Sequence, residues 1–334
     1  MKAISVVASV VGLALIAALV VHFGAAPVAH SLWAVGIIGF AAICLIHLAL
    51  IALMGIAWWT LLPGTKPWAA IWARLVRASA SEVLPLSQVG GYVLGARALS
   101  VAGVSGSEAA ASTIVDVGLE FWAQLAYVAI ALFWLLQLDP HAQAARPVAI
   151  GLVVAIGLAC GFLIAQCREF KILDRVADAF GRGWAQQVVA GAGNLHTAIV
   201  RIYARPAGIW ASFALHLVSW IAAAGEIWLA LRFMGKPRGF GVVLVIESLL
   251  YAVRSIAFAV PNAFGVQEGA YIVLGAGFGL APDVTLALSL MKRARDFTIG
   301  VSALGIYLLI ESGRLRHLAS STITRSLSEV KPRP

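Results

Sequence analysis

Residues 261–296, PNAFGVQEGAYIVLGAGFGLAPDVTLALSLMKRARD, place five glycines, a glutamate and a cluster of cationic side chains inside otherwise apolar sequence. Irregular backbone at the depth of a bilayer is tolerated only where protein or a water-filled cavity surrounds it, so this stretch should not face lipid. A carboxylate such as that of Glu268 is costly to bury in hydrocarbon unless a partner or a function retains it. The stretch therefore predicts a functional site, with the rest of the chain as its scaffold.

The composition is that of a membrane protein. Of the 334 residues, 61% are hydrophobic and 12% are charged, whereas about 25% of residues are charged in an ordinary soluble domain. A membrane-spanning helix needs about 20 apolar residues. Segments that approach or exceed this length are Ile4–Val21, Trp33–Trp59, Ala109–Leu136, Val148–Ala165, Pro206–Leu231, Val242–Val260 and Val284–Ile310. Two more, Val83–Val104 and Asn262–Leu280, are interrupted by glycines. We predict an all-α polytopic membrane protein with about eight apolar segments.

Several classes of function lack their sequence signals. Cys44, Cys160 and Cys167 form no CxxC pair, which predicts neither a disulfide framework nor a zinc site. The net charge of +9 is spread over short loops and ends, without the basic, aromatic-interleaved stripe of a nucleic-acid binder. Attraction to anionic lipid headgroups explains this charge, and an anionic substrate is the alternative. Phosphate-loop, dinucleotide-binding, HExxH and GxSxG motifs are absent. We therefore predict no metal, no cofactor, no nucleic-acid partner and no ATP-driven machinery.

The arrangement of charges predicts how the chain is oriented. Lys2 precedes the first apolar run as in a signal peptide, but the run is longer than the usual 7 to about 15 residues, so we expect a retained first helix. The connection after the second apolar segment carries Lys66, Arg74 and Arg77 beside tryptophans, which is typical of a cytoplasmic interface with an aromatic belt. This pattern predicts a cytoplasmic N-terminus and a multi-pass protein of the bacterial inner membrane.

The chain is predicted to be a single membrane domain, 1–334. It divides into a first half, a cytoplasmic amphipathic connection, a second half and a polar tail, at 1–166, 167–205, 206–311 and 312–334. The basic loop 232–238 falls outside by simple counting of segments, against the positive-inside tendency. We place the polar tail inside, which requires the 262–280 segment to cross the membrane.

A second interrupted stretch, EVLPLSQVGGYVLGARAL at 82–99, mirrors the first. A helix cannot run undisturbed through Pro85, because proline lacks an N–H and clashes with the preceding turn. QVGGYVLGA at 88–96 also matches QEGAYIVLGA at 267–276 if one residue is inserted. Glycine-interrupted segments in corresponding places of two halves point to a transporter binding site, and chance similarity is the alternative. We predict two re-entrant or discontinuous elements that converge on a central cavity. Their predicted backbone and hinge positions are Pro85, Gly90, Gly91, Pro261, Gly265 and Gly269.

Ionisable side chains lie inside several apolar segments. Asp116 and Glu120 are one turn apart, so they share a helix face that must look inward. If that face meets the cations of the last apolar helix, the charges neutralise each other or bind a zwitterionic or anionic headgroup. A purely structural ion-pair network is the alternative. Lys292 and Asp296 have the spacing of a pair within one helix.

Arg97 and Arg254 have no acidic residue four positions away, so each needs a partner elsewhere. A lipid phosphate matches the planar fork of arginine, and snorkelling to the headgroup region is the alternative. We expect His47 and His216 to be hydrogen-bonded core residues. The predicted substrate-binding residues are Arg97, Asp116, Glu120, Arg254, Glu268, Arg293 and Asp296.

These motifs resemble a known family. Residues 261–297 resemble the Pro…Gly-x-x-Glu…Arg region in the membrane domain of lysylphosphatidylglycerol synthases, a flippase-like family. Residues 82–121 resemble its first-half motif, in which a Leu-Pro turn precedes a glycine pair, an Arg-bearing segment and a helix that ends in an acidic position. GGYVLGARAL and VPNAFGVQEGAY are closest to the HpnL-like branch, which is associated with hopanoid biosynthesis loci. The resemblance implies roles for Pro85, Gly90, Arg97, Pro261, Gly265, Glu268 and Arg293.

The chain also departs from this family. Gly90-Gly91 stands where the family has Gly-Glu or Gly-Asp, which puts an acidic headgroup contact in the first half in doubt. The sequence holds no counterpart of the cytoplasmic aminoacyl-transfer domain of the full synthases, so we expect no lysyl transfer.

The sequence predicts a lipid translocase without catalytic residues, which holds the headgroup of a lipid between its two broken segments. The expected partners are membrane lipids and enzymes of lipid biosynthesis. One alternative is a membrane-embedded enzyme that uses Glu268 or Asp116 as acid or base on a lipid headgroup, which requires two ionisable groups within about 3 Å of one reacting atom. The other is a non-transporting partner of hopanoid or other lipid enzymes.

Overall fold

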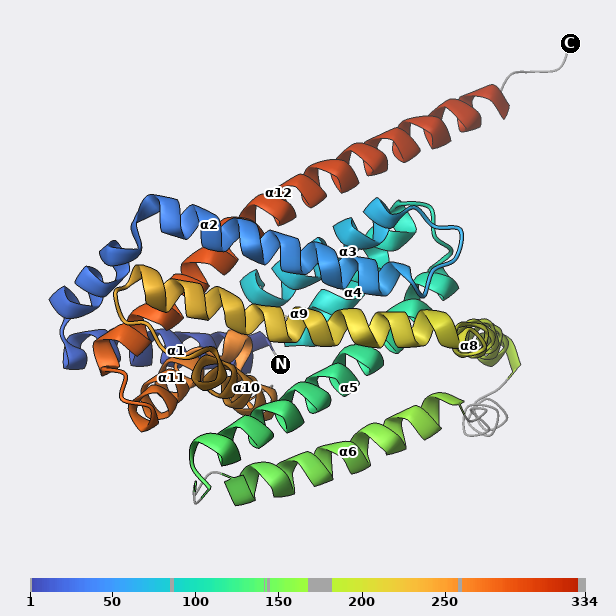
Figure 1. The fold of residues 1–334 in the computed structure, drawn as a ribbon. Helices are drawn as coiled ribbons and strands as arrows, with labels where there is room; N and C mark the ends of the chain where they lie inside the picture. The colour runs from blue at the N-terminus through green and yellow to red at the C-terminus, as the bar shows by residue number, and fades with distance from the viewer. Residues whose placement is uncertain are drawn as a thin grey trace, which may run out of the picture.

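The computed structural model describes residues 2–84, 87–140, 142, 145–167, 182–257 and 260–329. This part of the chain is all-α, as predicted (Figure 1). The helices are α1 (Lys2–Phe23), α2 (Ala25–Trp59), α3 (Pro67–Val83), α4 (Ser87–Val101), α5 (Gly106–Leu138), α6 (Ala145–Cys167), α8 (Arg182–Tyr203), α9 (Pro206–Phe233), α10 (Phe240–Ile256), α11 (Val266–Gly277) and α12 (Pro282–Glu329). A short 3-10 helix, η1 (Pro261–Ala263), precedes α11. Pro85 and residues 168–181 of the predicted amphipathic connection lie outside the described residues.

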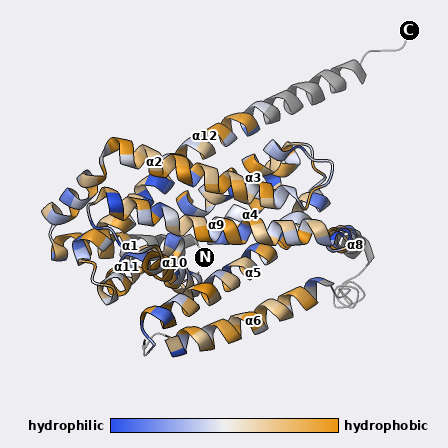
Figure 2. Ribbon diagram, in the orientation of Figure 1, coloured by the Kyte–Doolittle hydropathy of each residue, from blue (hydrophilic) through white to orange (hydrophobic). Residues whose placement is uncertain are grey.

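Helices α2, α5, α6, α9 and α12 are long and apolar enough to cross a membrane. Figure 2 shows α6 as hydrophobic along most of its length. Its outer side chains are exposed, including Val153 and Leu158 at 69% each, as expected for a helix that faces lipid tails. The predicted span Val242–Val260 is not among these helices, because α10 ends at Ile256.

The first interrupted stretch forms a helical hairpin, α3–α4. Helix α3 ends at Val83, and the extended ψ of 141° at the next residue, Leu84, is the conformation favoured before a proline. Helix α4 then returns along α3 at very short range. A Cβ atom at Gly91 would lie 2.8 Å from the carbonyl oxygen of Arg77, and one at Gly95 would lie 2.9 Å from Arg77 Cβ. The 17 residues of α3 extend about 25 Å, less than the hydrocarbon thickness of about 30 Å. The hairpin is therefore re-entrant.

The second interrupted stretch forms an equivalent hairpin, α10–η1–α11. Arg238, just before α10, donates to the carbonyl oxygen of Gly279, just after α11, at 2.6 Å. The two ends of this hairpin therefore lie side by side. The prediction that 262–280 crosses the membrane is wrong, because α10 and α11 together enter and return at one end of the bundle. The side of the membrane on which α12 and the polar tail end therefore does not require 262–280 to cross.

The two halves form an inverted repeat. In each, a long helix is followed by a 17-residue helix, a proline-bearing turn, a short helix and another long helix, as α2–α5 and as α9–α12. Helices α2 and α9 pack together and run in opposite directions (Figure 1). Helices α5 and α12 also run in opposite directions. Each hairpin also packs on the long helix of the other half, α3 on α12 and α10 on α5. The predicted pseudo-repeat is thus confirmed, with the two hairpins entering from opposite ends.

The close contact within the first hairpin makes Gly91 sensitive to substitution. We expect Gly91→Ala to lower the free energy of unfolding by about 1–3 kcal/mol, because the added methyl group overlaps the Arg77 carbonyl and the Ser81 hydroxyl. Gly151→Ala on α6 is the matched control, since no atom lies within 4 Å of its added Cβ. Thermal unfolding of both variants in the same detergent tests this. Equal midpoints would mean that α4 does not pack on α3 at Gly91.

Candidate functional site

Glu268 is fully buried where α11 meets α12. Gly265, at φ 79°, precedes the first turn of α11, and its N–H donates to Glu268 Oε2 at 2.8 Å. On α12, Ser289 Oγ donates to Oε1 at 3.0 Å. Arg293 binds both oxygens, with Nε 2.5 Å from Oε1 and Nη2 3.1 Å from Oε2. The carboxylate is therefore held by a helix N-terminus, a hydroxyl and a bidentate guanidinium.

Arg293 also holds the tip of the second hairpin. Asn262 and Ala263 adopt left-handed φ angles of 51° and 46°, which are uncommon for residues other than glycine. Their carbonyl oxygens accept hydrogen bonds from Arg293 Nη1 and Nη2 at 3.3 and 3.4 Å. The guanidinium lies 4.4 Å from the centre of the Phe264 ring. One buried cation thus joins Glu268 to a strained loop.

The first hairpin carries its own buried cluster. Arg74 binds both oxygens of Glu120 at 2.7 Å each. Arg77 bridges the two acids of α5, with Nη1 2.6 Å from Asp116 Oδ2 and Nη2 2.6 Å from Glu120 Oε2. His216 of α9 lies 2.9 Å from the other Asp116 oxygen. Two guanidinium groups therefore balance two carboxylates.

The tips of the two hairpins meet. Glu82, in the last turn of α3, accepts from Arg254 Nη2 at 3.0 and 3.2 Å. Its backbone carbonyl also accepts from Asn262 Nδ2 at 2.7 Å. An ion pair and a hydrogen bond therefore connect halves that lie far apart in the sequence.

Helix α12 makes a further ion pair with the second hairpin. Lys292, 2% exposed, binds Glu247 Oε2 of α10 at 2.7 Å. The Tyr271 hydroxyl donates to the other oxygen of Glu247. The ammonium lies 5.1 and 5.4 Å from the ring centres of Tyr251 and Tyr271. This arrangement combines an ion pair with cation–π contacts in a dry environment.

A third cluster lies where α2, α9 and α12 meet. Arg295 binds Glu226 of α9 and also Asp296 Oδ1, the latter at 2.7 Å. His47 of α2 faces both acids, with Nδ1 3.1 Å from Glu226 and Nε2 3.7 Å from Asp296.

Among the described residues, every cation of these buried clusters has a carboxylate oxygen within 3.0 Å. A headgroup phosphate would have to displace a carboxylate to reach one of them. The same contacts hold the carboxylates, so none of them is placed as a free base. This conformation is therefore closed, and a ligand could enter the network only if the ion pairs between helices separated.

The structure changes several of the predicted partnerships. Asp116 and Glu120 face α3 and pair with Arg74 and Arg77, so the contact with the cations of α12 that we considered does not form. Lys292 and Asp296, which have the spacing of a pair within one helix, each bind another residue instead. Arg97 lies apart from the buried clusters, 49% exposed, and binds Glu311 at 2.6 Å.

Other predicted site residues are brought together. Arg254, Glu268, Arg293 and Asp296 all belong to buried or half-buried ion pairs. The pairs of Glu268, Arg293 and Asp296 lie within the second half, and that of Arg254 joins this half to Glu82 of the first. Gly91 and Gly265 have structural reasons for their glycines, whereas a Cβ at Gly269 would meet no neighbour within 4 Å. His47 and His216 are hydrogen-bonded within the bundle, as predicted.

Sequence reasoning missed Arg74 and Arg77, which it placed at the membrane interface. They are 7% and 4% exposed. Their spacing of three residues puts both on one face of α3, and the α5 acids have the complementary spacing of four. The matching spacings of the α3 arginines and the α5 acids were the sequence signal from which this pairing could have been predicted. The tryptophans around them indicated a membrane interface instead, because aromatic residues are common both at membrane interfaces and in the protein interior.

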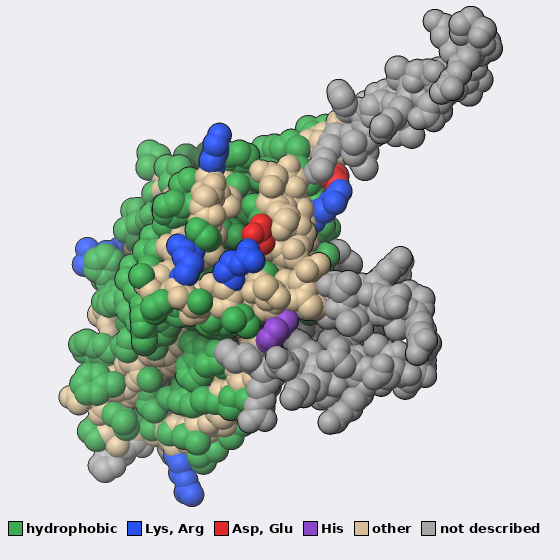
Figure 3. Space-filling model, turned by 90° about the vertical axis from the view of Figure 1, so that its right-hand side faces the viewer, with side chains coloured by type: hydrophobic (Ala, Val, Ile, Leu, Met, Phe, Trp, Pro, Cys, Tyr) green, Lys and Arg blue, Asp and Glu red, His purple; other side chains and the backbone are tan. Residues whose placement is uncertain are grey.

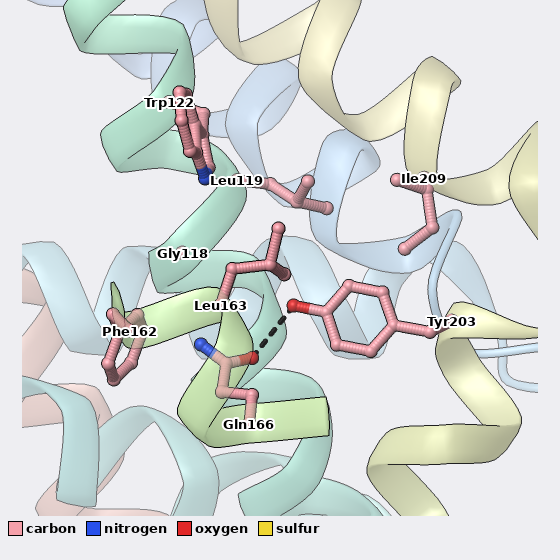
Figure 4. Close-up of a pocket in the computed structure, with 8 residues that line it drawn as sticks. All are labelled: Gly118, Leu119, Trp122, Phe162, Leu163, Gln166, Tyr203 and Ile209. Carbon is pink, nitrogen blue, oxygen red and sulfur yellow. Dashed lines mark hydrogen bonds between the residues drawn. The ribbon is translucent and has the colours of Figure 1, made fainter. Parts of the chain in front are cut away.

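A pocket of about 310 Å³ lies between α5, α6, α8 and α9 (Figure 4). Its lining residues are Gly118, Leu119, Trp122, Phe162, Leu163, Gln166, Tyr203 and Ile209. The Tyr203 hydroxyl donates to Gln166 Oε1 at 2.7 Å, and the other walls are mainly apolar. This pocket suits hydrocarbon and offers no charge to a headgroup.

Residues 5–305 match the family model described as the lysylphosphatidylglycerol synthase TM region. The chain belongs to this family. The match covers both hairpins and the first half of α12, and hence every cluster described above. No curated protein and no solved structure matches the chain. Family membership makes this a membrane protein with a lipid-related role.

Proposed function

We propose that this protein moves a lipid between the leaflets of a membrane and is not an enzyme. The observation that carries the proposal is the junction of the hairpin tips at Glu82, Arg254 and Asn262. Re-entrant elements of an inverted repeat that meet inside the membrane are the architecture of transporter binding sites. Membership of the lysylphosphatidylglycerol synthase TM region family supports a lipid as the cargo.

The conformation described above represents the closed state in this proposal. The headgroup passes between the hairpin tips, and the tip contacts separate to admit it. Arg254 and Arg293 then exchange carboxylate oxygens for those of the headgroup, while the tails remain in the bilayer. The apolar pocket beside α6 supports contact with tails, because only 6% of the apolar stretch of α6 is buried in the protein.

The charge distribution supports an orientation in the bacterial inner membrane. Figure 3 faces the end of the bundle where α3 begins and shows several Lys and Arg side chains on it. Exposed cations at or near the helix ends that meet there are Lys66, Arg97, Arg201 and Arg205. Residues 168–182 and the tail add basic residues in the sequence. By the positive-inside rule we assign this end, and the N-terminus, to the cytoplasm. A place in the HpnL-like branch, beside enzymes of hopanoid synthesis, is the finer form of the proposal.

A reversible cross-link between the hairpin tips tests this function. Glu82→Cys and Asn262→Cys are combined in a background with the three native cysteines replaced by alanine. The purified protein is placed in liposomes with fluorescent phosphatidylglycerol, phosphatidylethanolamine or a hopanoid. We expect oxidation to reduce lipid exchange to the rate of protein-free liposomes, because the tips can no longer separate, and reduction to restore it.

The two single-cysteine variants, oxidised in the same way, are the controls and should keep their rates. Mass spectrometry verifies the cross-link. Unchanged exchange by fully cross-linked protein would show that tip separation is not needed. Exchange by the reduced protein that equals the rate of empty liposomes, for every lipid, would remove the proposed function itself.

A further inference from the structure

The His47 cluster differs from the other buried clusters in its charge. It contains one guanidinium, Arg295, and two carboxylates, Glu226 and Asp296, so its net charge is −1 when His47 is neutral. The cluster around Asp116 is balanced, with two arginines for two acids. An uncompensated charge is costly in a low-dielectric interior, so the His47 cluster has a specific reason to take up one positive charge.

The geometry of the imidazole identifies that charge. Each ring nitrogen faces a carboxylate, Nδ1 at 3.1 Å from Glu226 and Nε2 at 3.7 Å from Asp296. A neutral histidine has one donor and one acceptor nitrogen, so one of them would direct a lone pair at a carboxylate. With one more proton in the cluster, both ring nitrogens carry hydrogen, so that Nδ1 donates to Glu226 and Nε2 makes an ion pair with Asp296. A proton therefore completes the site electrically and geometrically.

The charged residues around the His47 cluster do not supply the positive charge that would neutralise it. Lys292, from α12, is engaged by Glu247, and Glu82, from α3, is engaged by Arg254. The remaining ionisable neighbours among the described residues are Arg254 and Tyr251 of α10, which act on Asp296, and Cys44, on the same helix as His47. Arg254 is already paired with Glu82, and neither a phenol nor a thiol brings a positive charge. The cluster is open on one side of the protein, since the side chains of His47 and Asp296 are 24% and 11% exposed.

We propose that His47, Glu226 and Asp296 share one exchangeable proton, and that this proton is coupled to lipid movement. The second part rests on the function proposed above. The cluster lies at a contact between the two halves, because His47 is on α2 and the other residues are on α9 and α12. With the proton bound, the cluster is neutral and the helices pack closely. After its release, the excess negative charge favours an arrangement that hydrates the acids.

The chemical step is a proton transfer and nothing more. One N–H or O–H bond forms within the cluster when a proton arrives from water on one side of the membrane. The same bond breaks when the proton leaves to water on the other side. The only other covalent bond that changes is the O–H bond of the hydronium ion that gives up or takes back the proton, and no electron is transferred. One proton per lipid across a difference of one pH unit could bias the lipid between leaflets by about tenfold.

The test uses the full chain in liposomes that contain a trapped pH-sensitive dye and a fluorescent phospholipid. We expect the parent protein to carry protons inward only while lipid moves, and to distribute the lipid unequally under a pH gradient. His47→Gln should lose both effects, because glutamine keeps hydrogen bonds but binds no proton. Asp296→Asn should also lose them, because it neutralises the cluster permanently. Any lipid exchange that remains should no longer depend on pH.

His216→Gln is the matched control, since His216 also binds a buried carboxylate but belongs to the balanced cluster. Its rate can change, but its pH dependence and proton flux per lipid should equal those of the parent. Lipid exchange by the parent without proton flux or pH dependence would overturn the coupling and leave the proposed function standing.

A second measurement does not require lipid movement. Nitrogen NMR of histidine-labelled protein in a bilayer should show a His47 signal that changes with pH and whose change is altered by Asp296→Asn. The absence of any change at His47, and of any change in carboxylate infrared bands that Asp296→Asn removes, would refute the proton site. A clear titration without lipid exchange would instead refute the proposed function.

Discussion

Glu268→Gln is expected to lower the free energy of unfolding by about 3–5 kcal/mol and to abolish lipid exchange. Glutamine has nearly the same shape as the glutamate but leaves Arg293 charged and buried without a carboxylate. It also weakens the hydrogen bond from the Gly265 N–H and the contact with Ser289. Arg293 positions the carbonyls of Asn262 and Ala263, so the tip of the second hairpin should loosen as well. Unfolding in detergent and lipid exchange in liposomes measure the two effects.

The double variant Glu268→Gln with Arg293→Gln separates stability from function. It removes the orphaned charge, so most of the lost stability should return. Lipid exchange should stay absent, because the cation that we assign to the headgroup is gone. Recovery of exchange together with stability would show that this ion pair is structural. A single Glu268→Gln variant as stable as the parent would show that Glu268 does not pair with Arg293 in the membrane.

The hairpins could be predicted because their sequence signals are local. Pro85 and Pro261 restrict the backbone beside them, and the glycine-rich echo at 88–96 and 267–276 marks equivalent helices in the two halves. Glu268 was also recognisable, since a carboxylate within an apolar segment needs a specific environment. Each of these inferences depends on a few neighbouring residues and not on the rest of the fold.

The partners of the buried charges could not be derived in this way. Asp116 has cations at two suitable places in the sequence, one on α3 and one on α12, and only the packing of the hairpin decides between them. Length misled the prediction at α10, because the turn that ends this helix at Ile256 interrupts an apolar run long enough to span. The inverted packing of α3 on α12 and of α10 on α5 emerges only in three dimensions.

The pairing of α3 with α5 predicts the second large effect. Arg77→Gln should lower the free energy of unfolding by about 3–5 kcal/mol, because it leaves two carboxylates one turn apart with a single guanidinium. Arg77 is 4% exposed and also stacks 4.5 Å from the ring centre of Tyr92 on α4, so the first hairpin loses an internal contact too. Arg77→Lys should recover little, since an ammonium cannot span Asp116 and Glu120 as a fork does. Unfolding midpoints in one detergent provide the measurement.

A second substitution tests whether Arg77 has the partners that the structure gives it. Asp116→Asn restores the charge balance beside Arg77→Gln and should return most of the stability, whereas Glu268→Gln in the same background should lower it further. Both second substitutions remove one buried negative charge, so the comparison isolates the identity of the partner from net charge. If the two had equal effects, the cations of α3 would not be matched to the acids of α5. The ion pairs would then not explain why the first hairpin packs on α5. Its apolar contacts could hold it there, but they would not account for the burial of two arginines.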